Sequence, residues 1–236
     1  MGLQTLEDIG EVLYYATAFN PRYWVEGTAT SVSKDELLQA VRELFALLHQ
    51  RGISYALVGG IALLHYVEGR NAQDLAFLLP VEDLEKIPEI VTTYRDVYFA
   101  RGRYKGLQVD LLFTSNPLFR RVKEKYVRWE KFQGVDVPVA TVEGLLLLKM
   151  YALPSLYRQG DFARVSLYEN DIAMLMYAYE PDIERLLREV GMYLSQGERE
   201  ALQDIIQEIR ARVQRFREES AQGLAEDTNG RGDTSS

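Results

Sequence analysis

The sequence contains no cysteine, which excludes disulfides, thiolate-bound metals and a cysteine nucleophile. It has only two histidines, His49 and His65, too few for a typical histidine-based zinc site. No window approaches about 18 uninterrupted apolar residues, so no transmembrane helix is expected. The opening MGLQTLEDIG lacks the basic and apolar regions of a secretory signal, and Leu6 breaks the myristoylation pattern. These absences favour a cytoplasmic protein with no membrane partner.

Apolar and acidic residues are plentiful. The 236 residues are 47% hydrophobic, which suits one large or two small domains with a sizeable core. The net charge of −8 argues against broad nucleic-acid binding. Residues 101–131 are an exception, because nine basic side chains stand there against three acidic ones. This basic stretch is either a solvated helix face or a local patch for phosphates or RNA.

The hydrophobic pattern divides the chain into an α/β part and a helical part. Ser33 and Glu36 form a capping box at the start of an amphipathic helix that ends at Gly52. Apolar runs bounded by glycine or proline predict strands, and longer periodic runs predict helices. The predicted strands are 54–60, 74–80 and 107–114, with one more before 107; the predicted helices are 61–67, 81–94, a helix from Thr141, 169–190 and 195–219.

This layout predicts four segments. An irregular N-terminal segment at 1–33 precedes an α/β domain at 34–140 and a helical domain at 141–219. The tail at 220–236 has few apolar residues and is expected to be disordered.

Gly59 and Gly60 stand where the first strand turns into a helix. Glycine there permits a positive φ and a close backbone approach, and the turn also offers N–H groups to a phosphate. A tight turn needs glycine for its own geometry too, so the pair alone does not decide between the two roles. The pattern is neither GxGxxG nor a P-loop.

Strand positions 74, 76 and 110 have the spacing of a metal site with one member missing. Residues i and i+2 of a strand share a face, so a D-x-D strand aims two carboxylates at one spot. A third carboxylate from a neighbouring strand completes a two-metal phosphoryl-transfer site. Asp74 fills the first place and Asp110, inside the apolar run LQVDLLF, the third, where a carboxylate needs a partner or a metal. The middle place is Ala76, which cannot bind metal.

The stretch ALVGGIALLHYVEGRNAQDLAFLL (56–79) resembles the first motif of the polymerase-β-like nucleotidyltransferase superfamily. That motif is a strand, GG or GS, a helix and a D-x-D strand. The AbiEii-type branch, which includes many toxins of toxin–antitoxin pairs, is the most similar, and Arg70 matches its arginine before the second strand. LQVDLLF is similar to the strand with the third carboxylate. The branch's helical motif is matched downstream by Lys149, Arg158, Asp161 and Asp171-Ile172.

The resemblance implies a nucleotidyltransferase fold, in which a mixed sheet with flanking helices is followed by a helical domain that closes over the nucleotide cleft. Asp74 and Asp110 would hold Mg²⁺ or Mn²⁺, and Asp110 would also draw a proton from the attacking hydroxyl. Lys149 would contact the phosphates, although a lysine after four leucines could also snorkel from a core edge. The residues implied to bind the nucleotide are Gly59, Gly60, Arg70, Lys149 and Arg158.

The implied reaction transfers a nucleoside monophosphate from an NTP to a hydroxyl of RNA, a protein or a small molecule, with release of pyrophosphate. A tRNA acceptor could lie along the basic stretch 101–131. A cognate antitoxin would be a further partner.

Ala76 departs from the family pattern, and loss of the middle carboxylate should cripple transfer. Three explanations stay open: a naturally degenerate site, an introduced Asp→Ala substitution, or replacement by another acid such as Glu68 or Asp83. Two functions follow, an impaired nucleotidyltransferase and a non-catalytic member that binds a nucleotide or a partner. A third, weaker reading treats Gly59, Asp110 and Lys149 as core features of a structural protein.

Overall fold

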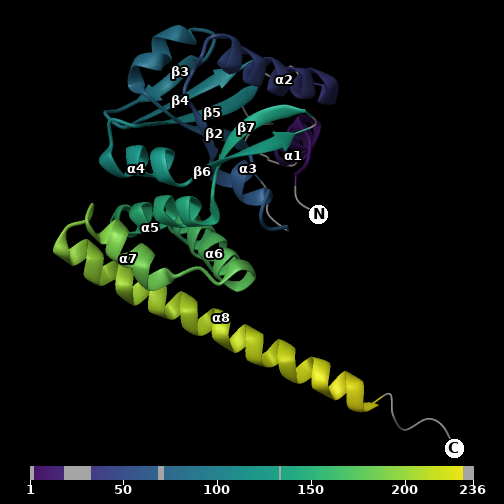
Figure 1. Ribbon diagram of the computed structural model, residues 1–236, viewed down its shortest axis with the longest axis vertical. Coiled ribbons are helices and arrows are strands. Elements are labelled where there is room, and N and C mark those ends of the chain that lie inside the picture. Colours follow the sequence, from purple (N-terminus) through teal and green to yellow (C-terminus); the bar gives the residue numbers. More distant parts are fainter. Residues whose placement is uncertain (1–2, 19–32, 69–71, 133, 231–236) are drawn as a thin grey trace, which may run out of the picture. The chain divides into compact units, whose positions relative to one another are not determined.

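The computed structural model describes residues 3–18, 33–68, 72–132 and 134–230, of which 222–230 are described as backbone only. The chain divides into two compact units, Met1–Leu148 and Lys149–Ser236 (Figure 1). The division falls inside helix α5 (Val142–Gln159), whereas the sequence suggested a boundary just before this helix.

A mixed sheet, seven-stranded over the described residues, is the frame of the first unit. The strand order is β3-β4-β5-β2-β1-β7-β6. The β2–β5 and β1–β7 pairs are parallel, and the other neighbours are antiparallel. The strands are β1 (Ala56–Val58), β2 (Asp74–Leu79), β3 (Val91–Arg95), β4 (Phe99–Tyr104), β5 (Leu107–Phe113), β6 (Val127–Phe132) and β7 (Val135–Ala140).

Helices cover both faces of this sheet (Figure 1). On one face the Phe45 ring of α2 (Lys34–Gln50) lies 5.8 Å from the Phe77 ring of β2. Helix α1 (Leu6–Ala18) packs against α2, while α3 (Gly59–Leu64) and α4 (Pro117–Lys125) lie on the opposite face. The predicted fold class, a mixed α/β sheet with flanking helices followed by a helical region, is confirmed.

The predicted start of α2 is also confirmed. The Ser33 hydroxyl accepts a hydrogen bond from the Glu36 N–H at 3.2 Å, and the Glu36 carboxylate accepts one from the Ser33 N–H at 2.8 Å. This capping box satisfies backbone donors that the first helical turn leaves without partners.

The regular secondary structure of the second unit, over its described residues, consists of helices joined by short connections. The later part of α5 is followed by α6 (Phe162–Tyr179), α7 (Ile183–Gly191) and α8 (Gln196–Gly230). Arg217 of α8 donates to the backbone carbonyls of Met176 and Tyr177 at the end of α6. No helix within the described ranges is long and apolar enough to cross a membrane.

Four local predictions were wrong. The start, expected to be irregular, is helical over Leu6–Ala18, while 19–32 lie outside the described residues. Residues 81–94, expected to be one helix, form the short 3-10 helix η2 (Val81–Lys86) and then β3, because Pro88 disfavours helical backbone at the residue before it.

The other two differences lie in the second unit. The predicted helix 169–190 is two helices, because Glu180 is left-handed (φ 48°) and Pro181 follows it. Helix α8 continues to Gly230, through much of the segment expected to be disordered, and 231–236 lie outside the described residues.

Candidate functional site

The glycine turn lies directly against strand β2. β1 ends at Val58, and α3 begins at Gly59 with a φ of 71°, a conformation that favours glycine. A Cβ on Gly59 would lie only 2.8 Å from the Cβ of Ala76. Gly59 is therefore required both for its backbone conformation and for this close approach.

Four residues form a row across the middle of the sheet. Val58 pairs with Ala76, Ala76 with Asp110, and Asp110 with Arg101. Side chains of paired residues point to the same face, and successive residues alternate between faces. Because Phe77 faces α2, the row faces the side of α3 and α4, which is also the side of Gly59.

The Asp110 carboxylate is bound by an arginine. Nε of Arg101 donates to Oδ1 at 2.7 Å, and Nη2 donates to Oδ2 at 2.6 Å. The Asp110 side chain is 10% exposed and that of Arg101 is 32% exposed. This two-pronged, charge-assisted geometry explains how an ionised aspartate is tolerated in an apolar strand.

Arg101 is a site residue that the sequence reasoning missed, since it counted this arginine only within the basic stretch. The signal is present in RGRYKGLQVD. Lys105 and Gly106 both have positive φ, of 45° and 86°, as in a two-residue hairpin turn. Such a turn fixes the register outward from Tyr104 and Leu107, which places Arg101 opposite Asp110.

The residues present do not fit the two-metal centre that the family resemblance implies. Asp74 lies at the start of β2, on the same face as Ala76, and is partly exposed. Ala76 offers no donor atom, and both oxygens of Asp110 accept hydrogen bonds from Arg101. Among the described residues, no group of three His, Asp or Glu side chains is placed to hold a metal ion.

Asp83 does not replace the missing carboxylate. It lies in η2, beyond the end of β2 that is remote from Asp74. Its side chain is buried and accepts a hydrogen bond from Nζ of Lys86 at 2.5 Å. The backbone N–H of Ser54 also donates to it, at 3.4 Å, so Asp83 joins η2 to the chain before β1.

The predicted phosphate ligand Lys149 belongs to the second unit, where it is buried. Its Nζ lies 2.6 Å from Oδ2 of Asp171 and 4.4 Å from the centre of the Tyr168 ring. The Asp171 side chain is fully buried, at 0% exposure. The pair thus joins α5 to α6 inside the helical unit.

Of two further predicted nucleotide ligands, the structure describes Arg158 but not Arg70. Arg158 donates from Nη1 to Glu198 at 2.6 Å, near the start of α8, and its side chain is 60% exposed. Arg70 lies outside the described residues.

The basic stretch 101–131 does not form one continuous patch on the sheet. Arg101 and Arg103 lie on β4, next to the edge strand β3, while Arg128 and Lys131 lie on the other edge strand, β6, with β5, β2, β1 and β7 between. Helix α4 carries four further basic residues, of which Lys123 has a pKa lowered by burial.

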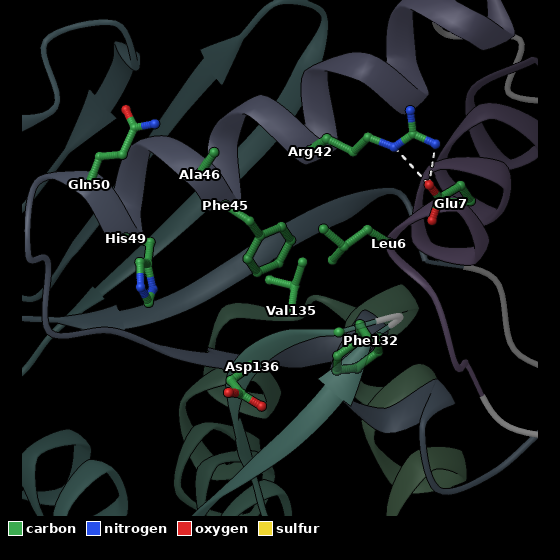
Figure 2. A pocket seen from close by; sticks show the side chains of 11 residues that line it. Leu6, Glu7, Arg42, Phe45, Ala46, His49, Gln50, Phe132, Val135 and Asp136 are labelled. Atoms are coloured by element: carbon green, nitrogen blue, oxygen red, sulfur yellow. Dashed lines mark hydrogen bonds and ion pairs between the residues drawn. The ribbon is translucent and has the colours of Figure 1, made fainter.

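A pocket of about 520 Å³ lies elsewhere in the first unit, between α1, α2 and the β6–β7 hairpin (Figure 2). Leu6, Phe45 and Phe132 form an apolar floor, and the ion pair between Arg42 and Glu7 flanks it. None of the predicted site residues that the structure describes lines it. We therefore place the candidate site at the row of Ala76, Asp110 and Arg101 together with the Gly59 turn beside it.

No protein-family model and no curated protein sequence matches the chain. The crystal structure of ANT(2″)-Ia in complex with adenylyl-2″-tobramycin is similar at 11% identity and a TM-score of 0.47, over 73% of this chain and 98% of that one. The solution structure of the antibiotic-resistance factor ANT(2″)-Ia has 10% identity and a TM-score of 0.45, over 77% and 96%. An antigenic nucleotidyltransferase-like protein from Paracoccidioides brasiliensis has 16% identity and a TM-score of 0.43, over 74% and 94%. At these levels the similarities assign no reaction or substrate to this chain.

Proposed function

We propose that the first unit is a nucleotidyltransferase-type domain that binds a nucleoside triphosphate, and that in this sequence it is impaired in nucleotide transfer. The observation that carries the proposal is the row in which the glycine turn, Ala76, Asp110 and Arg101 stand side by side. It has the order of a nucleotidyltransferase site, with its middle acid absent and its third acid paired to an arginine.

The impairment follows from the chemistry of phosphoryl transfer. Such transfer depends on groups that stabilise charge on the phosphoryl oxygens and on a base for the attacking hydroxyl. Ala76 supplies neither, and Asp110 already accepts two hydrogen bonds from Arg101. Loss of one well-placed stabilising group typically costs about 10²–10³ in rate.

Parts of the proposal depend on the family resemblance alone. They are Mg²⁺ or Mn²⁺ as the cofactor of a site that keeps all three acids and has no competing arginine, RNA or tRNA as acceptor, and a toxin role with a cognate antitoxin. A single continuous RNA surface along 101–131 is not favoured, since its strand residues are divided between β4 and β6, with four strands between them. Helix α4 and β6 are the better candidates for an acceptor surface.

Calorimetric titration of ATP, GTP, CTP and UTP tests the proposal on the full chain, on Arg101→Gln and on Arg95→Gln. Arg95 is the matched control, because it lies in the same sheet on the opposite face, 5.7 Å from the Phe113 ring. We expect at least one NTP to bind the parent and Arg95→Gln alike, and Arg101→Gln more weakly. A parallel assay should find pyrophosphate release at background. Absence of binding by all four NTPs, or rapid pyrophosphate release, contradicts the proposal.

A further inference from the structure

We infer that the Arg101 guanidinium occupies the position of a metal ion beside Asp110. This arginine, together with Ala76, prevents divalent metal ions from binding at the site. The inference rests on the proposed nucleotidyltransferase-type site and names the residues that determine its metal preference. Its consequence is that restoring an aspartate at position 76 does not by itself restore a metal site.

The arginine is built into the sheet rather than resting on its surface. Arg101 and Asp110 are direct partners on β4 and β5, and the tight turn at Lys105 and Gly106 fixes their register. The two N–H···O contacts of 2.6 and 2.7 Å engage both carboxylate oxygens. A guanidinium stays protonated at any physiological pH, so its positive charge beside Asp110 is permanent.

A divalent ion at Asp110 would therefore meet two obstacles. It would have to displace a planar fork that matches the carboxylate geometry. It would also have to accept a fixed positive charge within a few ångströms, in a site where Asp110 is only 10% exposed and screening by water is weak. Ala76 offers no oxygen to offset either cost.

An aspartate at position 76 would stand directly beside Asp110 on the same face of the sheet. Neighbouring strands lie about 4.8 Å apart, so the new carboxylate would lie close to Asp110 and its arginine. We expect the positive charge of Arg101 to offset the charges of both carboxylates, so that no metal ion binds between them.

The test measures Mn²⁺ binding without nucleotide, and the paramagnetic resonance signal of free Mn²⁺ is the readout. The full-length proteins compared are the parent, Ala76→Asp, Ala76→Asp with Arg101→Gln, and Ala76→Asp with Arg95→Gln. We expect only the Arg101→Gln double variant to bind Mn²⁺ more tightly than the parent, by about tenfold or more. Adding Asp110→Asn to it should remove the gain. If thermal melting shows that the glutamine double variant is unfolded, Ala76→Asp with Arg101→Met, which keeps the aliphatic bulk, takes its place.

Two results would overturn the inference. One is Mn²⁺ binding by Ala76→Asp as tight as by the double variant, because Arg101 would then be no obstacle. The other is the absence of any gain in a folded double variant, because Asp74, Asp110 and the new acid would then form no metal site. Neither result depends on nucleotide binding, so failure of the inference is distinguishable from failure of the proposed function.

Discussion

Gly59 shows how one residue connects the backbone of the turn to the candidate site. Replacing it with alanine imposes a left-handed conformation that costs an L-residue about 1–2 kcal/mol. It also places a Cβ 2.8 Å from that of Ala76. We expect Gly59→Ala to lower the free energy of unfolding by more than this strain alone, as measured by urea denaturation.

Gly52→Ala is the matched control for that substitution. Gly52 has a similar φ of 62°, but nothing lies within 4 Å of where its Cβ would be. It should therefore report the backbone strain without the steric contact. Equal losses in the two variants would mean that the close approach to Ala76 is unimportant.

The pair of Arg101 and Asp110 is expected to contribute to stability as well as to chemistry. Arg101→Gln leaves a nearly buried carboxylate without its charged partner, and hydrogen bonds to charged groups contribute about 1.5–3 kcal/mol. We expect a loss of this size in Arg101→Gln and a smaller one when Asp110→Asn is added. A double-mutant cycle measures the coupling, and a coupling near zero would contradict the observed geometry.

At the scale of single elements, the start of α8 provides a pH-dependent test. The hydrogen bonds from Ser195, together with Arg158, lower the pKa of Glu198 to about 2. The ionised carboxylate accepts from the Ser195 N–H at 2.9 Å, as in a capping box. Because the folded-state pKa lies below the ordinary value of 4.5, this stabilisation is present above pH 4.5 and is lost as the pH falls toward 2.

Glu198→Gln keeps an oxygen that can accept from the Ser195 N–H but removes the charge, so it should lower the free energy of unfolding at pH 7 by about 0.3–1 kcal/mol. The difference from the parent should shrink as the pH falls from 4.5 toward 2. Thermal melts across this range measure it, with Glu219→Gln, an exposed site farther along α8, as control. A difference that is constant with pH would show that the carboxylate charge is not the cause.

The connection between α5 and α6 depends on the buried ion pair of Lys149 and Asp171. Lys149→Met leaves a fully buried carboxylate without its cation, which typically costs about 3–5 kcal/mol. Adding Asp171→Leu should recover most of that loss, because a buried pair is often replaceable by apolar residues. Denaturant midpoints test both, and an unchanged midpoint in the single variant would contradict this role.

Predictions from the sequence succeeded for elements whose signals are local. The capping box at Ser33, the glycine turn at 59–60 and the paired strands around Lys105-Gly106 each depend on residues close together in the chain. Helix α1 was missed although its signals are local. Thr5 and Asp8 cap its start, and its apolar residues recur at helical spacing, at Leu6, Ile9, Leu13 and Ala16. Strand β6 was missed because it is short and mostly polar, so its stability depends on pairing with β7.

Over the whole molecule, the site was only partly predictable from the sequence, because it depends on which strands are neighbours and on their register. Asp110 could be singled out because an acid in an apolar strand needs a partner, but its partner depends on sheet register. The basic stretch 101–131 was read as one unit because its residues are contiguous in sequence. The strand order divides its strand residues between β4 and β6, with four strands between them, which no linear pattern reveals.

The central claim is that this site binds a nucleoside triphosphate with Arg101 in the place of a metal ion. The most direct test is calorimetric titration of the best-binding NTP into the parent protein, once with Mg²⁺ and once with EDTA. We expect dissociation constants that differ by no more than about threefold, since the permanent charge of the guanidinium is present in both conditions. Loss of binding in EDTA would contradict it, because a metal ion would then be the cation on which the site depends.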